Sequence, residues 1–377
     1  MPPYTLKSII LERTKTGVMA ELNGGPSSPA SLASVVASPM APDSHPSDDD
    51  DTDCQSLTES ITDYPVEWGR TYHRYNADSY LFPNDDVERN RMNLQYDCVK
   101  RLHGGKLLLP PIKNPERILD IGTGTGIWPI EVADMFPNAR VIGTDLSAIQ
   151  PAEVPPNVFF EIADCTDDEW GYKLSSFDLI HTGFMLGSLQ SFYDLVTMSK
   201  RYLKRGTGWL ECLELDIGPF CDDGTIPKDW GYAQYTDYLI EASKRVVPPR
   251  PMDTAQNIVT WIRQAGYVDV QERVDKMPLN PWPKDPRLKQ LGQDWEQHLI
   301  QGIAAWSYKL FGERGLGWTR ERIEIFLMDV RKAIKDRYVH AYAKIHVVYG
   351  RRPSDEEERQ MGRMPAPPVN GARGGPP

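Results

Sequence analysis

Short apolar runs alternate with amphipathic stretches through the middle of the chain. The apolar runs predict five strands, at Arg117–Ile121, Arg140–Thr144, Asn157–Ala163, Phe177–Thr182 and Gly208–Asp216. Helical patterns lie between strands at Gly126–Phe136 and Phe192–Leu203. Strands that alternate with helices along the chain are typical of βαβ units. The pattern therefore predicts an α/β fold with a parallel sheet.

Further elements are expected on both sides of this core. Before it, Asn84 or Asp85 is expected to cap a helix that ends at Gly104 and Gly105. After it, the pattern predicts helices and strands at Asp229–Val247, Thr254–Ala265, Tyr267–Lys276 and His340–Tyr349, with a helical insertion at about 284–337 before the last strand. We thus expect a Rossmann-like sheet with helices on both faces and an N-terminal helical cap. Such insertions at strand ends often carry substrate contacts.

The two ends of the chain differ in composition from the core. Residues 1–60 are rich in Ser, Pro and Asp and have too few apolar side chains to offset the entropy of ordering. They are expected to be a disordered tail. The folded domain is expected to span residues 61–353, and residues 354–377 are expected to be a flexible C-terminal tail.

Charge and cysteine content exclude several classes of protein. The net charge is −11, and residues 1–60 alone hold nine acidic against three basic side chains, so no basic stripe for nucleic acid is expected. The five cysteines contain no CxxC pair, which argues against a structural metal site and a disulfide framework. No apolar run suits a signal peptide or a membrane span. We expect an intracellular protein of the cytoplasm or nucleus.

The strongest chemical signal is the run Ile118–Gly126, which reads ILDIGTGTG and joins a strand to a helix. Gly122, Gly124 and Gly126 allow positive φ angles and a close approach of the backbone to a ligand. The helix that follows offers free N–H groups at its start. Asp145 ends the next strand, where a carboxylate can bind both hydroxyls of a ribose.

The residue before the glycine turn distinguishes between nucleotide cofactors. Asp120 would repel a pyrophosphate, but it suits the cationic amino group of a methionine moiety. The turn therefore favours S-adenosylmethionine, while a dinucleotide or a fold without a ligand remain the alternatives. The residues expected to bind the cofactor at this point are Asp120, Gly122, Thr123, Gly124, Gly126, Asp145 and Leu146.

Two later strand ends carry further candidates. Asp164, which Cys165 follows, is placed to accept a hydrogen bond from an adenine amine, and both residues are expected at the cofactor. The alternative for Asp164 is a cap on the next turn. His181 is the candidate catalytic base, because it ends a strand at the edge where open α/β sheets bind ligands. The alternative is a histidine satisfied by backbone groups near the cofactor.

The chain resembles the fungal LaeA-like methyltransferases from about Arg70 to Pro353. Besides the glycine turn, several short motifs carry the resemblance. They are TYH at 71–73, YLFPND at 80–85 with Glu88 and Arg91, FDLIHTGFMLGS at 177–188, WLECLELD at 209–216, CDD at 221–223 and PLNPWP at 278–283. It implies a class I methyltransferase that uses S-adenosylmethionine and acts in, or regulates, fungal secondary metabolism. Thr123 stands where many methyltransferases have Cys or Ser.

Aromatic side chains suggest where an acceptor binds. Tyr72, His73 and Tyr80 are expected either to form a lid, with Tyr72 at the cofactor, or to pack the N-terminal helix on the sheet. Tryptophans of the insertion either line an acceptor pocket or belong to the core. The expected partner is a small-molecule acceptor or a regulatory protein, and the alternative to an enzyme is a weakly catalytic or non-catalytic scaffold that binds partner proteins through this fold.

Overall fold

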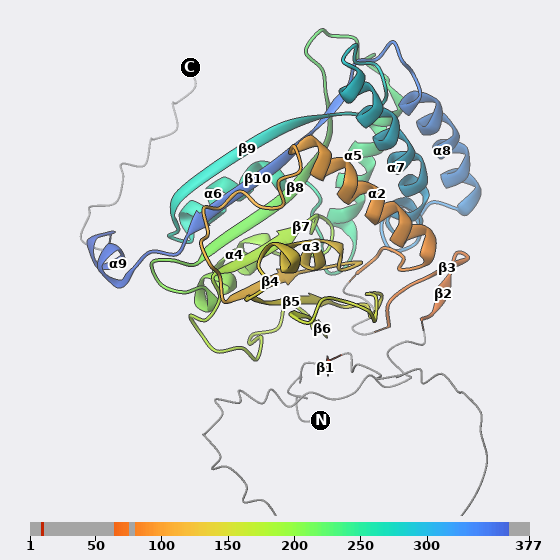
Figure 1. Ribbon diagram of the computed structural model, residues 1–377. Coiled ribbons are helices and arrows are strands. Elements are labelled where there is room, and N and C mark those ends of the chain that lie inside the picture. The colour runs from red at the N-terminus through yellow and green to blue at the C-terminus, as the bar shows by residue number, and fades with distance from the viewer. Residues whose placement is uncertain (1–8, 11–63, 75–79, 362–377) are drawn as a thin grey trace, which may run out of the picture.

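The structure is a computed structural model that describes residues 9–10, 64–74 and 80–361. Its central feature is a mixed sheet (Figure 1) whose strands lie in the order β1 (Ile9–Ile10), β6 (Val158–Ile162), β5 (Arg140–Asp145), β4 (Arg117–Ile121), β7 (Leu179–Gly183), β8 (Trp209–Phe220), β10 (Tyr342–Arg351) and β9 (Val268–Pro278). The five strands from β6 to β8 are parallel. Strands β10 and β9 continue the sheet in antiparallel pairing.

Helices cover both faces of the sheet, as expected for parallel strands. Successive residues of β4 point to opposite faces, so that Ile118 joins the core under α3 (Ile127–Met135), while Leu119 joins the core under α4 (Phe192–Tyr202) and α6 (Ile258–Gln264). A short 3-10 turn, η1 (Ala255–Asn257), leads into α6. Burial of both faces explains why these strands consist almost entirely of apolar residues.

A separate group of helices lies over one end of the sheet (Figure 1). It consists of α2 (Asp86–Leu102), α5 (Gly231–Arg245), α7 (Pro286–Phe311) and α8 (Arg320–Ile334), which share one hydrophobic core. The side chain of Asp85 caps α2 by accepting from the N–H of Glu88, as the sequence predicts. The expected insertion is the α7–α8 pair.

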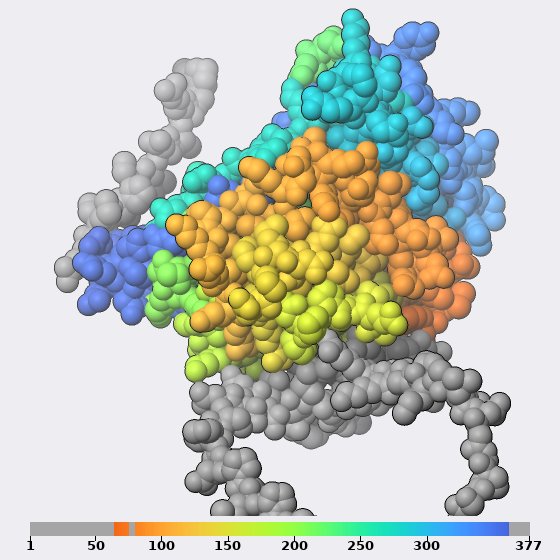
Figure 2. Space-filling view, viewed as in Figure 1, coloured from red at the N-terminus to blue at the C-terminus, as the bar shows by residue number. Residues whose placement is uncertain are grey.

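Helix α2 connects the helical group to the sheet. Its atoms lie directly against those of α3 in the space-filling view (Figure 2), and both Tyr96 and Lys100 donate to the Glu131 carboxylate of α3, at 2.8 and 2.5 Å. The opposite side of α2 packs along α7. A site between the sheet and the helical group is therefore walled by α2.

The chain ends differ from expectation where the structure describes them. Residues 9–10 form β1 against β6 inside the segment expected to be disordered, and the remainder of 1–60 lies outside the described residues. The expectation of a flexible tail from 354 is wrong for residues 355–361, which form α9 (Asp355–Met361). Arg351 holds this helix by pairing with Glu357 at 2.8 Å, a long-range effect that composition alone does not reveal.

Two further features concern local structure. A small hairpin of β2 (Val66–Glu67) and β3 (Arg70–Thr71), which the sequence pattern did not predict, precedes α2. Strand β8 runs four residues past its expected end at Asp216, because β10 pairs with it as far as Phe220. Across the described ranges, every helix is too short or too polar to serve as a bilayer-spanning segment.

Candidate functional site

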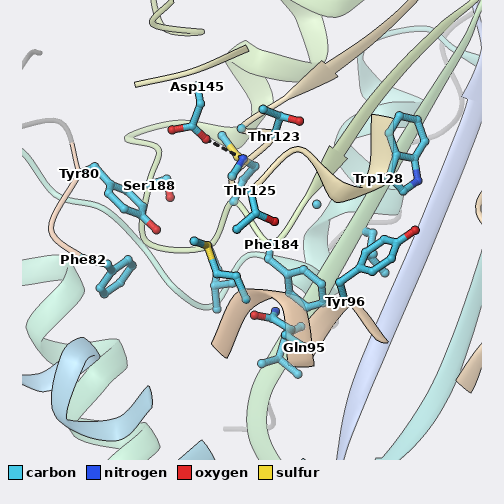
Figure 3. A pocket seen from close by; sticks show the side chains of 18 of the residues that line it. Tyr80, Phe82, Gln95, Tyr96, Thr123, Thr125, Trp128, Asp145, Phe184 and Ser188 are labelled. Carbon is cyan, nitrogen blue, oxygen red and sulfur yellow. Dashed lines mark hydrogen bonds between the residues drawn. The ribbon is translucent and has the colours of Figure 1, made fainter. Parts of the chain in front are cut away.

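A cavity of about 270 Å³ lies between the carboxyl ends of the parallel strands and the helical group (Figure 3). This edge of an open parallel sheet is where such folds bind ligands. One end of the cavity is formed by the glycine turn and by the ends of β5 and β6, and the other by α2, α5 and α7. The cavity therefore joins two environments, one at the sheet edge and one among the helices.

The glycine turn has the geometry that its sequence predicts. Gly122, Gly124 and Gly126 have φ angles of +69°, +57° and +77°, which side chains rarely adopt. A Cβ at Gly122 would lie 2.3 Å from the sulfur of Met185, and a Cβ at Gly126 would lie 2.3 Å from Cζ of Phe160. The turn thus has no room for side chains at these two positions, and its backbone forms part of the cavity wall.

Asp120 lies beneath this turn, and its carboxylate is engaged on both sides. Its Oδ2 accepts from the hydroxyl of Thr123 at 2.6 Å, and its Oδ1 lies 2.7 Å from Nδ1 of His181. Asp120 is only 3% exposed, yet it lines the cavity. Its oxygens retain lone pairs for a ligand, since a carboxylate can accept about four hydrogen bonds.

His181 is held as firmly as the carboxylate that it contacts. Its ring stacks on Trp128 with the centroids 3.9 Å apart and an angle of 7° between the planes. In the sheet His181 lies between Asp120 on β4 and Glu211 on β8, so three ionisable residues form a row across neighbouring strands. The partner of the His181 ring is thus a carboxylate rather than the backbone groups of the alternative role, and His181 lines the cavity.

Asp145 lies at the end of β5 on the cofactor side of the cavity (Figure 3). Its two oxygens accept from the N–H groups of Gly124 at 2.8 Å and Ser147 at 2.9 Å. Burial raises the pKa of Asp145 to about 6, against the opposing effect of these backbone hydrogen bonds. The carboxylate is placed where ribose hydroxyls can donate to it, and Leu146 beside it also lines the cavity.

The end of β6 contributes the next part of the wall. Asp164 accepts at Oδ1 from both the N–H and the hydroxyl of Thr166, at 2.9 and 2.7 Å. Its Oδ1 therefore caps the following turn, and Asp164 also lines the cavity together with Cys165, so the cap and a ligand contact are compatible. Burial raises the pKa of the Cys165 thiol, so this side chain is a neutral, apolar wall rather than a nucleophile.

Of the predicted cofactor residues, Gly126 and Tyr72 do not line the cavity, and only Tyr72 lies outside the glycine turn. Its ring is buried below Lys309, whose Nζ lies 3.6 Å from the ring centroid. Tyr80 does line the cavity, and its carbonyl oxygen lies 2.9 Å from Nε2 of His73. Of the three aromatic residues, Tyr72 is thus a buried packing residue, whereas Tyr80 forms part of the cavity wall.

Sequence reasoning missed a buried polar cluster at the helical end of the cavity. Glu88, Arg91 and Gln95 of α2 and His298 of α7 all line it, and each is at most 8% exposed. The signal was available in part, because residues 88, 91 and 95 fall on one face of a helix. The contact between Arg91 and His298 spans 207 residues and has no local signature.

The tryptophans of the insertion divide between the two expected roles. Trp306 lines the cavity, with the Arg91 guanidinium 5.1 Å from its ring centroid. Trp295 is fully buried in the core, Trp318 packs at its margin, and Trp282 donates to the carbonyl oxygen of Ala341 at 2.9 Å. Within the described part of the chain, no group of His, Cys, Asp and Glu side chains is arranged to hold a metal ion.

Comparison with known proteins agrees with this geometry. A family profile described as "Methyltransferase domain" matches residues 91–272. "Methyltransferase pytC" of Aspergillus terreus is 36% identical over 310 residues, which cover 82% of this chain and 94% of the relative. "Secondary metabolism regulator LAE1" of Cochliobolus heterostrophus is 34% identical and covers 76% and 94% of the two chains. "Secondary metabolism regulator laeA" of Aspergillus fumigatus is 31% identical, with coverage of 77% and 78%.

Proposed function

Because this chain belongs to the LaeA-like family of S-adenosylmethionine-dependent methyltransferases, we propose that it methylates a small molecule of fungal secondary metabolism. The observation that carries the proposal is the single cavity that joins the glycine turn to a pocket between α2, α5 and α7. A methyl acceptor must reach the donor without water between them. A cavity that continues from the cofactor side into a largely apolar chamber meets this requirement.

The residues of the turn fit the proposed cofactor. The positive φ angles of Gly122, Gly124 and Gly126 leave a surface without side chains, against which a nucleoside can lie. Asp145 receives the ribose hydroxyls, and the Asp120 carboxylate faces a cationic amino group. Asp164 contributes an acceptor at the end of β6 for an adenine amine. Bound S-adenosylmethionine supplies an activated methyl group, whose departure leaves a neutral thioether.

The protein's part in the reaction is then mainly positioning. Trp128 and Asp120 hold the His181 ring in place on two sides, and we assign His181 to orienting Asp120 rather than to removing a proton. Methyl transfer to a nucleophilic oxygen, nitrogen or carbon needs no strong base when the acceptor is already reactive at neutral pH. Alignment of donor and acceptor in a dry chamber supplies the rate enhancement.

Titration of the purified chain with S-adenosylmethionine in a calorimeter tests the first claim of the proposal, that the chain binds this cofactor. We expect micromolar affinity, about −8 kcal/mol, and a strong loss in Asp145→Ala. Asp222→Ala is the matched control, because Asp222 is a carboxylate at the surface that pairs with Lys276 outside the cavity. Absence of binding by the folded parent protein would rule the proposal out and favour a non-catalytic scaffold.

Methyl transfer from labelled S-adenosylmethionine tests the second claim of the proposal, that the acceptor is a small molecule. Incubation with a small-molecule extract and, separately, with a nuclear protein extract of a producing fungus distinguishes the acceptor classes. We expect the label in the small-molecule fraction, and its loss with Asp145→Ala.

The second candidate function is a regulator that methylates or binds proteins. It is favoured by the relatives named secondary metabolism regulators, which match this chain over about three quarters of its length. This candidate predicts label in the protein fraction, a stable complex with a protein partner, and nuclear location.

A further inference from the structure

We propose that the helical end of the cavity is the acceptor site, and that it selects an uncharged, largely aromatic molecule whose oxygen accepts hydrogen bonds from Gln95 and His298. This inference rests on the proposed function and specifies its substrate class. It starts from the buried cluster of Glu88, Arg91, Gln95 and His298, all of which line the cavity.

Arg91 is the centre of the cluster, and most of its N–H groups are already used. Its Nε and NH2 donate to Oε1 of Glu88 at 2.9 and 2.7 Å. Its NH1 donates to Oε1 of Gln95 at 2.8 Å and lies 3.1 Å from Nδ1 of His298. Since a guanidinium has five N–H donors, four of them are committed within the protein. Arg91 therefore organises its neighbours, with at most one donor to spare.

Arg91 also decides which atoms its neighbours present to the cavity. A guanidinium can only donate, so Nδ1 of His298 must be an acceptor and the ring proton must lie on Nε2. Burial and the charge of Arg91 keep the pKa of His298 well below its usual value, so the ring is neutral. Gln95 likewise uses its oxygen toward Arg91, which leaves its NH2 group for other partners. The cluster thus offers N–H donors.

The cluster offers these donors without a net charge. Glu88 neutralises Arg91 through a buried ion pair in which the two side chains are 2% and 6% exposed. An ammonium ligand such as a lysine side chain would need a free carboxylate here, and a carboxylate ligand would need a free cation, because burying an unpaired charge is costly. At this cluster both would meet a pair that is already neutralised, so an uncharged ligand with a carbonyl or ether oxygen fits it best.

The remaining walls are apolar and rich in aromatic rings. Beside the cluster, the chamber is lined by Phe82, Phe184, Leu213, Tyr232, Leu239 and Trp306. Gln95 and Phe184 both line this cavity and are labelled in the close view (Figure 3). Trp295 stacks on the His298 ring at 4.3 Å, which fixes its orientation. Flat rings stack favourably in such a chamber.

The test uses the naphthalene ketone Prodan, whose fluorescence reports a dry environment, with protein saturated with S-adenosylhomocysteine. Dimethylaminonaphthalene lacks the ketone and is the matched probe, while anilinonaphthalene sulfonate carries a negative charge. On the parent protein we expect Prodan to bind about tenfold more tightly than the ketone-free probe, as one or two hydrogen bonds to its oxygen would give. The sulfonate is expected to bind more weakly than Prodan. Equal affinity for the first two probes, or tighter binding of the sulfonate, overturns the inference.

Variants then locate the contacts. Gln95→Leu and His298→Phe are each expected to weaken Prodan binding several-fold and to leave the ketone-free probe unaffected. Leu213→Phe, which fills the chamber without touching the cluster's hydrogen bonds, is expected to weaken both probes. Unchanged Prodan affinity in a polar variant that still binds S-adenosylmethionine contradicts the proposal.

Measuring S-adenosylmethionine binding alongside Prodan binding distinguishes failure of this inference from failure of the proposed function. A parent protein that binds S-adenosylmethionine but not Prodan retains the function and loses the inferred acceptor class. A parent that binds neither overturns the proposed function itself. If His298→Phe does not fold, the comparison of probes on the parent protein and Gln95→Leu still decide the outcome.

Discussion

Nδ1 of His181 lies 2.7 Å from a carboxylate oxygen of Asp120, on the strand next to it. The other oxygen of Asp120 accepts from Thr123 in the glycine turn, so the histidine, the carboxylate and the turn form one connected unit. Trp128 closes the unit by stacking on the histidine ring. We propose that His181, bound in this way, orients Asp120.

Removal of the His181 ring should therefore weaken cofactor binding. We expect His181→Ala to lower the affinity for S-adenosylhomocysteine about tenfold, the loss of one charge-assisted hydrogen bond. Calorimetry measures the change. His346→Ala is the matched control, because His346 on β10 pairs with Glu272 on β9 and does not line the cavity. Undiminished affinity in His181→Ala would show that the pair does not support the cofactor.

The glycines of the turn should differ in their tolerance of a methyl group. Gly126→Ala places a Cβ 2.3 Å from Phe160 at a φ of +77°, and should cost about 3 kcal/mol of unfolding free energy. Gly124→Ala meets its nearest atom at 3.5 Å and should cost only about 1 kcal/mol, the price of its backbone conformation. Denaturant unfolding of both variants provides the comparison. Equal losses would mean that the contact with Phe160 relaxes freely.

Cofactor affinity should depend on pH through Asp145. Burial raises the pKa of this carboxyl to about 6, and only the ionised form accepts hydrogen bonds from both ribose hydroxyls. Affinity should be constant above about pH 7 and should fall by up to about tenfold per pH unit below pH 6. Titrations between pH 5 and 8 test this, and Asp145→Asn should bind weakly with a flat profile. A flat profile in the parent protein would contradict it.

The buried pair of Glu88 and Arg91 should matter for stability in an asymmetric way. Arg91→Leu leaves Glu88 without its partner in a site that is 1% exposed, and should cost about 4 kcal/mol. The double variant with Glu88→Leu should recover much of this loss. Arg89→Leu on the same helix removes only the exposed pair with Asp86 and should have little effect. Thermal or denaturant unfolding distinguishes these outcomes, and a double variant no better than Arg91→Leu would count against the explanation.

Glu214 should make the protein less stable as pH rises. Its Oε1 accepts from the N–H of Met185, and its Oε2 is buried with no hydrogen-bond partner among the described residues. Burial raises its pKa to about 8 from the ordinary value of 4.5. Between these values the folded protein keeps a proton that the unfolded chain releases, so the contribution of Glu214 to stability falls as pH rises.

Glu214→Gln should remove this dependence, because the amide keeps an acceptor oxygen and does not ionise. We expect the variant to be more stable than the parent at pH 8, by up to about 4 kcal/mol, and similar to it near pH 4.5. Unfolding curves at both pH values measure the difference. Glu153→Gln, at an exposed position, should change neither value. A gain that is the same at both pH values would show that titration is not its cause.

Local sequence was sufficient for much of the fold and for the cofactor side of the cavity. Strands buried on both faces, the Asp85 cap and the glycine turn all leave periodic or short-range patterns, because each depends on residues within one or two turns of chain. Asp120, Asp145 and Asp164 follow from the same logic, since parallel strands bring their carboxyl ends to one edge. Asp120 before the glycine turn already favoured S-adenosylmethionine over a dinucleotide, and the family resemblance agreed with it.

Tertiary structure decided the rest. That β10 lies between β8 and β9, that Arg351 orders α9, and that Tyr72 packs under Lys309 all depend on contacts between distant segments, for which no local pattern exists. The acceptor end shows this most clearly. The sequence pattern predicts a helix with Glu88, Arg91 and Gln95 on one face. The contact between His298 and Arg91 depends on the tertiary structure. That contact fixes which nitrogen carries the proton, and so which hydrogen bonds the cavity can offer.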